Sequence, residues 1–374
     1  MAHAYTPGLK VTESARLRRE RRLPLRGDVL VAPGDAVAPD TVVARTELPG
    51  NVQTINLAAK LALDPARVPG ALTRPLGAAV KRGETLAEGK SLFGLLTQRA
   101  AAPVDGTLES VSAVTGQLIL REPPIPVVVN AYVRGVIAAV LPREGVVVET
   151  EAALVQGIFG VGGETFGAIR LVTTSPDQEL LADRLTEAHR GAVVVGGCYV
   201  SHDTLMRARQ LGVAAVVVGG FDDRDLRQLL GRDLGVAITG SEEIGITLVL
   251  TEGFGRIPMA DRTWRLLAAH DGEQASVSGA TQIRAGVLRP EVVIPRSRQA
   301  GGSAEPPAGT GLEVGSLLRV IREPYFGRIG RVVELTPALK ELDTEARVRV
   351  TTVEFADDRT RAVVPRANVE LIEG

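Results

Sequence analysis

Short apolar runs alternate with amphipathic segments in the middle of the chain. Five runs are continuously apolar and rich in β-branched residues, as expected for buried parallel strands: residues 168–174, 192–195, 214–218, 236–239 and 247–250. Between them, three segments carry helical periodicity after an N-cap residue: 177–189 at Asp177, 201–211 at Ser201 and 222–230 at Asp222. Strands that alternate with helices predict a parallel α/β sheet.

The pattern before residue 141 is different. Apolar runs there are short and separated by Pro and Gly, which is typical of all-β folds. A weak repeat relates residues 37–44 to residues 80–87: in each copy a valine precedes a turn, and a second apolar strand ends in alanine. Another hairpin is predicted at residues 102–112, where an Asp-Gly pair supplies the tight turn. We interpret the two copies as quasi-equivalent halves of one small sandwich with pseudo-twofold symmetry.

The clearest boundary is residues 296–310, with the sequence RSRQAGGSAEPPAGT. Gly, Ser, Ala and Pro without apolar periodicity predict a flexible linker. Short alternating strands beyond it, at residues 347–350 and 362–365, predict a small barrel. The chain is therefore expected to combine an α/β fold with all-β modules, in five parts: a basic N-terminal arm 1–23, a β domain 24–145, a central parallel α/β domain 146–295, the linker 296–310 and a C-terminal barrel 311–374.

Two stretches of the β domain, GAAVKRGETLAEG and AAPVDGTLESVSAVTG, resemble the biotinyl/lipoyl-like barrel-sandwich hybrid fold. That family pairs V-x-x-G-x-x-L-A with A-P-x-x-G-x-[VL]. The resemblance covers residues 24–122 and is interrupted by residues 47–72, which read as an insertion. Carrier members of the family present a modifiable lysine at a hairpin tip, commonly between methionines. Lys60, Lys81 and Lys90 have no such setting, so the resemblance implies a structural use of the fold.

The C-terminal stretch EPYFGRIGRVV, residues 323–333, resembles a KOW motif. This motif occurs in the SH3-like barrels of transcription elongation factors and ribosomal proteins, and the resemblance covers about residues 312–372. It implies contact with RNA, DNA or a protein complex. Arginines could bind phosphate and the aromatic pair could stack on a base, so the candidate contact residues are Arg319, Arg322, Tyr325, Phe326, Arg328 and Arg331. The alternative is a core role for the aromatic pair, and nearby acidic residues offset the arginines.

Composition narrows the possible functions. The 374 residues include 43 basic and 44 acidic side chains, one cysteine and four histidines. The chain is too apolar to be disordered, and one cysteine excludes a disulfide scaffold. No apolar run approaches a membrane span and no signal-peptide core is present, so a cytoplasmic location is expected. Few groups titrate near pH 7 and none has metal-ligand spacing, so we predict neither a cofactor nor a metal and have little ground for an enzyme.

Glycines follow three of the predicted strands directly. In an open α/β sheet the carboxyl ends of the strands form the edge that faces ligands, and helix N-termini there favour anions. Arg256 follows another strand and could clamp a carboxylate or phosphate. The candidate ligand residues at this edge are Gly196, Gly197, Gly219, Gly220, Gly240 and Arg256. Tight strand-to-helix turns need glycine in any case, which is the alternative explanation.

The segment from Gly196 to Val216 is similar to the swivelling phosphohistidine domain of phosphoenolpyruvate-utilising enzymes. A glycine pair, a Ser-His and a Leu-Gly recur, which would make His202 the phosphate carrier and Ser201 its neighbour. Insertions on both sides of Ser201-His202 shift the histidine from the family's position. We therefore favour Ser201 as an N-cap and His202 as an exposed residue in the first helical turn.

Two further segments invite a binding role. Residues 157–167 are rich in glycine but lead into a strand and lack a Gly-Lys-Ser/Thr ending, so a turn that enters the sheet is favoured over a phosphate loop. Residues 16–22 contain five arginines, which could bind nucleic acid or acidic lipid. Pairing with acidic residues of the same chain or of another subunit is equally reasonable.

Two hypotheses from different classes follow. The first is a non-enzymatic adaptor or scaffold that binds a macromolecular complex, such as the transcription or translation machinery, through the C-terminal barrel. The second is an enzyme subunit or sensor that binds a small anionic metabolite at the strand carboxyl ends of the central domain. An open pocket shared by Gly196, Gly219 and Arg256 would favour the second hypothesis. The sequence gives no indication of the oligomeric state.

Overall fold

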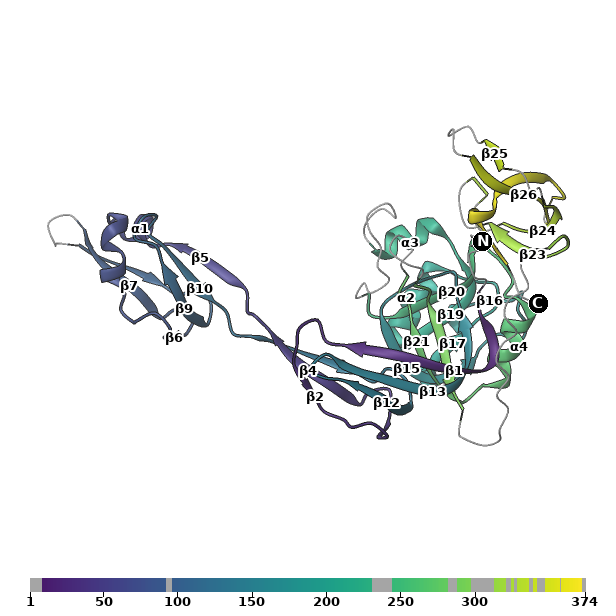
Figure 1. The fold of residues 1–374 in the computed structure, drawn as a ribbon, viewed down its shortest axis with the longest axis horizontal. Helices are drawn as coiled ribbons and strands as arrows, with labels where there is room; N and C mark the ends of the chain where they lie inside the picture. The colour runs from purple at the N-terminus through teal and green to yellow at the C-terminus, as the bar shows by residue number, and fades with distance from the viewer. Residues whose placement is uncertain are drawn as a thin grey trace.

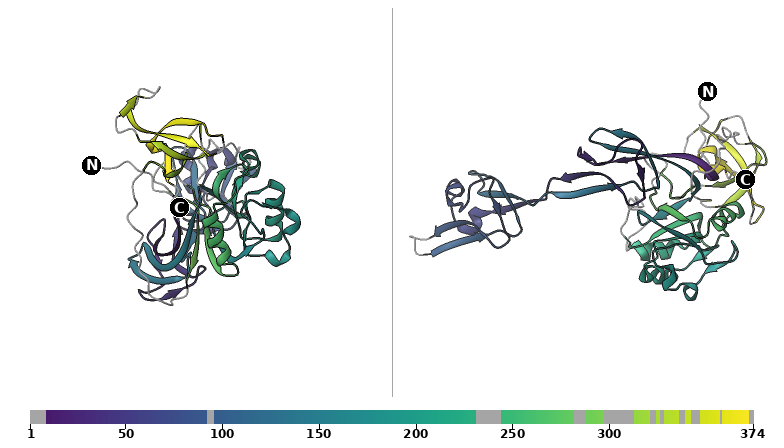
Figure 2. Two further views of the ribbon diagram at one scale, coloured as in Figure 1. Left: turned by 90° about the vertical axis from the view of Figure 1, so that its right-hand side faces the viewer. Right: turned by 90° about the horizontal axis from the view of Figure 1, so that it is seen from below.

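The computed structural model describes residues 9–91, 96–230, 244–281, 288–296, 313–320, 324–325, 328–335, 339–341, 347–356 and 358–371. The protein is mostly β and elongated (Figure 1). A small module lies at one end, a β lobe in the middle, and an α/β body with the C-terminal barrel at the other end. The right-hand view of Figure 2 shows the same separation of the small module from the body.

The central sheet confirms the coarse expectation of parallel strands. Its parallel part joins β20 (Thr247–Phe254), β19 (Ala215–Phe221), β17 (Val193–Val195) and β15 (Glu164–Leu171) in that order. These strands form the core with α2 (His202–Leu211), α3 (Asp223–Leu230) and α4 (Asp261–Ala269). The predicted strand 236–239 lies outside the described residues.

The sheet also contains antiparallel strands that the periodicity did not predict. β14 (Phe159–Val161) pairs with β20, while β21 (Gln274–Ser278) and β22 (Glu291–Pro295) continue from β15. The long strand β13 (Gly145–Gln156) then pairs with β22 and connects the body to the lobe. The glycine-rich stretch 157–167 thus forms β14, a turn at Gly162 and Gly163, and the start of β15. The expected turn that enters the sheet is present, but it is preceded by a strand that the sequence did not predict.

The predicted helix over residues 177–189 is wrong. The segment contains β16 (Glu179–Leu180) and two 3-10 turns, Ala182–Arg184 and Glu187–His189. β16 pairs in parallel with β18 (Tyr199–Val200), and the Gln178 carbonyl accepts from the Cys198 backbone N–H at 3.0 Å. Tertiary pairing therefore overrides the helical periodicity, and the two apolar residues Leu180 and Leu185 reach the core without a helix.

The middle lobe gathers strands from both sides of the small module. They are β1 (Val11–Arg22), β2 (Asp28–Val29), β3 (Ala36–Val37), β4 (Val42–Leu48), β11 (Ile125–Asn130), β12 (Gly135–Leu141) and part of β13. β1 runs antiparallel to β13 along its whole length, and β11 pairs with β4. Their apolar faces enclose one core, which includes Val43, Ala131 and Ile137.

The small module, residues 52–121, has a separate core. Its elements are β5 (Val52–Asn56), α1 (Leu57–Leu61), β6 (Ala79–Val80), β7 (Thr85–Ser91), β8 (Leu96–Ala101), β9 (Gly106–Val111), β10 (Gln117–Arg121) and the 3-10 turns Pro65–Arg67 and Pro69–Ala71. We call it the distal module.

One ribbon connects the distal module to the lobe. β4 and β5 run antiparallel to β11 and β10, and the pairing keeps one register from Ala44↔Val129 to Asn56↔Gln117. The strands are interrupted at residues 49–51 and 122–124, where prolines remove backbone donors. Gly50 allows the two chains to stay close there, because a Cβ at this residue would lie 2.0 Å from the Glu122 carbonyl oxygen.

The interpretation of the repeat as two halves of one sandwich is also wrong. The copy at 37–44 spans β3 and β4 in the lobe, whereas the copy at 80–87 spans β6 and β7 in the distal module. The two copies share a local hairpin-like form, but each packs into its own core. Similar turn residues give the two copies a similar local structure. The long ribbon of β4, β5, β10 and β11 separates them, so they belong to different modules.

The C-terminal residues form a small sheet with its own core. Its strands are β23 (Leu317–Val320), β24 (Ile329–Glu334), β25 (Leu339–Glu341), β26 (Arg347–Phe355), β27 (Arg361–Pro365) and β28 (Val369–Leu371), with the 3-10 turn Arg366–Asn368. They pair in the order β25-β26-β24-β23-β28, with β27 against β26. Most of the predicted linker, 296–310, lies outside the described residues.

Candidate functional site

The glycines at the carboxyl ends of the parallel strands contact backbone of the same chain. A Cβ at Gly219 would lie 2.1 Å from the Ile257 carbonyl oxygen, and one at Gly220 would lie 2.0 Å from the Gly255 carbonyl oxygen. At Gly197 the nearest atom is the Gln178 carbonyl oxygen, 2.3 Å away. The space that a ligand would need above these glycines is therefore taken by other segments of the chain.

Gly196 lies in similarly close surroundings, since a Cβ there would come within 2.9 Å of Leu180 and 2.8 Å of Val218. Gly240 lies outside the described residues. The described glycines are therefore explained by other segments of the chain that pack closely against this edge of the sheet. This packing gives no support to a metabolite site shared by Gly196 and Gly219.

Arg256 reaches the same edge but already has two partners. Its guanidinium lies 2.5 Å from a Glu179 carboxylate oxygen and 4.4 Å from the centre of the Tyr199 ring. Hydrogen bonding to Glu179 raises the pKa of Arg256, so the cation stays charged and paired. Burial raises the pKa of the nearby Cys198 thiol, which makes it a poor nucleophile.

The start of α2 is capped by side chains of the same chain. The Ser201 hydroxyl accepts from the Thr204 backbone N–H at 3.2 Å, as predicted for an N-cap. The Asp225 carboxylate accepts from the His202 backbone N–H at 3.0 Å and from the Tyr199 hydroxyl at 3.4 Å. Asp225 thus supplies the anion that a helix N-terminus favours. The expectation of an exposed His202 is wrong, because its side chain is only 17% exposed.

The five arginines of residues 16–22 form a strand whose cations all pair within the chain. Arg16 and Arg18 contact Glu151 and Glu149 on the neighbouring strand β13, and the other arginines pair as follows: Arg19 with Glu291, Arg21 with Glu164, and Arg22 with Glu20 and Glu144. The sequence left open binding to nucleic acid or lipid and pairing with acidic residues, and the structure shows pairing with acidic residues of the same chain. Each of the five arginines therefore has at least one carboxylate partner in the chain.

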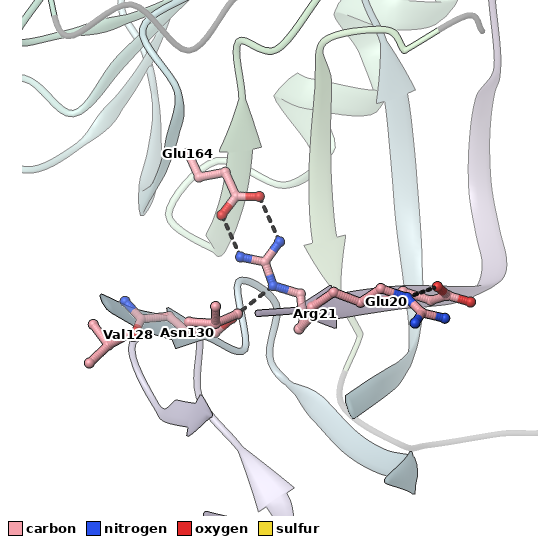
Figure 3. Close-up of a pocket in the computed structure, with 7 residues that line it drawn as sticks. Glu20, Arg21, Val128, Asn130 and Glu164 are labelled. Carbon is pink, nitrogen blue, oxygen red and sulfur yellow. Dashed lines mark hydrogen bonds and ion pairs between the residues drawn. The ribbon is translucent and has the colours of Figure 1, made fainter. Parts of the chain in front are cut away.

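A cleft of about 580 Å³ opens where β1, β11 and β15 meet (Figure 3). The Arg21 guanidinium extends across it and donates to both Glu164 carboxylate oxygens, at 2.7 and 2.6 Å. Its Nε donates to the Asn130 carbonyl oxygen at 2.8 Å. Arg21 also lies 5.3 Å from the centre of the buried Tyr132 ring. Arg21 thus donates three hydrogen bonds that join lobe and body, so we interpret this side chain as a strut between them.

Tyr132 extends this strut into the interior. Its hydroxyl donates to the Glu291 carboxylate at 3.3 Å, and that carboxylate also pairs with Arg19. Burial, followed by the negative charge of Glu291, raises the pKa of Tyr132 well above its usual value, so the phenol stays protonated as a donor. The network thus connects β1 to β15 and β22 of the body.

Replacing Arg21 by Ala should lower the free energy of unfolding by about 1–2 kcal/mol, because the three hydrogen bonds of a side chain that is only 16% exposed are lost. Arg16→Ala is the matched control on the same strand. The Arg16 side chain is 65% exposed and 3.6 Å from Glu151, so its loss should cost under about 0.5 kcal/mol. Urea unfolding of both variants measures the difference. Equal losses would contradict the role of Arg21 as a strut.

The C-terminal barrel uses several of its candidate contact residues internally. Tyr325 packs on Phe355 with ring centres 5.2 Å apart, which supports the core interpretation of this aromatic. Arg328 lies 3.8 Å from the centre of the Phe355 ring and 2.7 Å from an Asp358 carboxylate oxygen. Arg331 is exposed and donates to the Gly315 carbonyl oxygen at 3.1 Å. Arg322 and Phe326 lie outside the described residues.

Arg319, on β23, is buried against the body rather than exposed to phosphate. Its side chain is 1% exposed and forms an ion pair with Glu252 on β20. Arg319 also donates to the Thr251 carbonyl oxygen at 3.4 Å, and Glu252 accepts from the Ala260 backbone N–H at 3.0 Å. The barrel is therefore docked on the carboxyl end of β20, a contact that the sequence did not predict.

Asp358 offers a pH test of the barrel. Hydrogen bonds from Thr360, with help from Arg328, lower the pKa of Asp358 to about 2. A depressed carboxylate pKa contributes stability above the unfolded value near 4, and this contribution is lost as the pH falls toward 2. We expect a carboxyl NMR titration to place the Asp358 midpoint near pH 2. Acid unfolding of the barrel should shift to higher pH in Asp358→Asn, and an unshifted midpoint would contradict the contacts described.

No group of three or more His, Cys, Asp or Glu side chains within the described ranges could hold a metal ion. The longest described helix, α2, has 10 residues, and none of the described helices is long and apolar enough to cross a bilayer. The chain matches no family model among those compared. It also matches no curated protein. Candidate functional surfaces must therefore be judged from the structure alone. With the glycine edge of the sheet filled by backbone, we consider the distal module and the outer face of the barrel next.

Proposed function

We propose that the protein is a non-enzymatic adaptor that presents two β modules to a macromolecular complex. The observation that carries this proposal is the distal module on its ribbon. Its core consists of residues 55–120 alone, and the ribbon holds it away from the α/β body (Figures 1 and 2). An independent core at the end of an extended ribbon exposes a large surface without adding to the stability of the body, as expected for a contact module.

The C-terminal barrel is the second contact module in this proposal. Its resemblance to KOW-containing barrels points to the transcription or translation machinery as the complex. Arg319 is buried against Glu252 and Arg328 pairs with Asp358, so two of the arginines suited to phosphate already have carboxylate partners. We therefore favour a protein contact over an RNA or DNA contact for this barrel. The resemblance of residues 24–122 to the barrel-sandwich hybrid fold spans both the lobe and the distal module, and it implies the same structural role.

Site-specific photocrosslinking in the cells of origin tests the proposal. A photoreactive residue replaces Val114 on the distal module or Val363 on the barrel, and Leu181 on the body serves as the control. Val363 and Leu181 are similarly exposed, 43% and 44%. We expect Val114 and Val363 to crosslink to subunits of one complex, and Leu181 to give no crosslink to them.

Two results would overturn the adaptor. The first is a lack of macromolecular crosslinks at both Val114 and Val363. The second is a stoichiometric small anion in native mass spectra of the full chain, which would favour the metabolite-binding hypothesis instead.

A further inference from the structure

The distal module carries a groove of about 370 Å³ that is lined by five apolar residues together with Thr73 and Arg74. Its lining comes from one loop and the end of β9: Pro69, Leu72, Thr73, Arg74, Pro75, Leu76 and Val111. Leu76 is 48% exposed, and Val114, three residues after the lining residue Val111, is 87% exposed. An exposed aliphatic side chain in the wall of a hollow marks an interaction surface more strongly than one on a flat surface does.

The groove is held open by backbone contacts rather than by mobile side chains. The Thr73 backbone N–H donates to the Leu86 carbonyl at 2.9 Å, and the Gly77 N–H donates to the Leu108 carbonyl at 2.7 Å. These bonds fix both ends of the loop to β7 and β9. Pro69 and Pro75 further restrict its backbone. Since the walls are already ordered, a partner would bind without the entropic cost of forming the site.

The module that carries the groove has an excess of positive charge. Residues 52–121 contain eight basic and five acidic side chains. Four of the acids already hold a base: Glu84 with Arg74, Glu88 with Arg99, Asp105 with Lys81, and Glu109 with Arg121. The fifth, Asp64, accepts from the Ala66 backbone N–H.

This pairing leaves a surplus of cations. Within the described residues no ion pair engages the exposed side chains of Lys60, Arg67 and Arg82. Arg82 lies in the turn that ends at Glu84, the partner of Arg74 in the groove wall. An acidic partner would therefore meet uncompensated positive charge on the module that carries the groove.

We propose that this groove binds an acidic polypeptide segment that inserts aliphatic side chains between Leu72, Leu76 and Val111. The proposal rests on the adaptor function and names the chemistry of the partner at its distal end. The aliphatic lining favours protein over nucleic acid, because no aromatic side chain for base stacking occurs among the described residues of the module. Apolar insertion supplies affinity, and the surplus cations select acidic sequences and speed their association.

A phage-displayed library of random 16-residue peptides, selected on the full-length protein, tests the proposal. We expect the enriched peptides to combine Asp or Glu with Leu, Ile or Val. Leu76→Asp should weaken the best peptide at least about tenfold, because it removes the apolar contact and repels the acid. Leu76→Lys removes the same contact but attracts the acid, so it should weaken binding less. Val128→Asp, at a 57% exposed apolar residue of the lobe, should leave affinity unchanged.

Three outcomes would contradict the proposed binding of an acidic peptide. They are enriched peptides without acidic residues, a peptide affinity that Leu76→Asp does not change, and an equal loss of affinity in Leu76→Asp and Leu76→Lys. An oligouridylate that binds the full chain and is lost in Leu76→Asp would assign the groove to RNA instead. Self-association that disappears in Leu76→Asp would assign it to a second copy. If the peptide test fails while the Val114 and Val363 crosslinks persist, the proposed peptide-binding groove is wrong and the proposed adaptor function is retained.

Discussion

Arg319→Met is expected to release the C-terminal barrel from the body. The substitution leaves the Glu252 carboxylate buried without its cation, and removing one partner of a buried ion pair costs about 3–5 kcal/mol. Glu252 keeps the hydrogen bond from the Ala260 N–H, which compensates for only part of the lost interaction. Hydrogen exchange should therefore accelerate in β23 and at the carboxyl end of β20, while the distal module exchanges as in the parent.

A double variant distinguishes the effect of the unpaired Glu252 charge from the effect of losing the contact between barrel and body. Glu252→Leu combined with Arg319→Met replaces both charges by apolar groups, and such exchanges are often neutral. We expect it to recover most of the protection lost in the single variant. Arg331→Met, which alters an exposed arginine on the adjacent strand β24, should not affect docking. Parental exchange in Arg319→Met would show that the barrel docks without this pair.

Docking changes what the barrel can do in an adaptor. Arg319 lies on the strand that pairs with both β24 and β28, on the face of the small sheet that points away from its core. Arg331 pairs opposite Leu317 and therefore lies on the same outer face as Arg319. Docking buries this outer face at Arg319, so a partner must bind the part that stays exposed, at Val363 and Arg331. The barrel and body therefore form one unit, and the ribbon positions the distal module apart from that unit.

The strands of the body were predictable because burial on both faces leaves a continuous apolar run. Residues 192–195 and 247–250 show this pattern, and both lie in the parallel part of the sheet. The segment 177–189 was not predictable in this way. Its helical periodicity is real, but the Glu179–Leu180 pairing with β18 depends on a chain segment 20 residues away.

Partners of charged residues were the hardest feature to predict. Alternating arginines in β1 and the glutamates at 149 and 151 of β13 are a signal for cross-strand pairing, but only once the register is known. Arg319 carried no signal at all, because an arginine that binds phosphate and one that binds a buried glutamate look alike in sequence. The glycines after the strands were ambiguous for the same reason, since glycine permits close approach by a ligand or by backbone.

Gly219→Ala resolves that ambiguity. The new methyl group would lie 2.1 Å from the Ile257 carbonyl oxygen, 3.1 Å from the Met259 N and 3.2 Å from the Gly197 carbonyl oxygen. All three atoms are backbone, so relief requires that β19 or residues 255–259 move. Such overpacking costs about 3 kcal/mol, which corresponds to a Tm lower by about 6–12 °C in a domain of this size. Calorimetry of the full chain measures the shift.

Gly70→Ala is the matched control for this experiment. Nothing lies within 4 Å of a Cβ at Gly70, so the same substitution there should be neutral or slightly stabilising. If Gly219 were kept for the approach of a ligand, Gly219→Ala would melt at the parental temperature and lose only binding. A large loss of stability confined to Gly219→Ala would instead assign this edge of the sheet to packing, and leave the distal module and the barrel as the surfaces through which the protein acts.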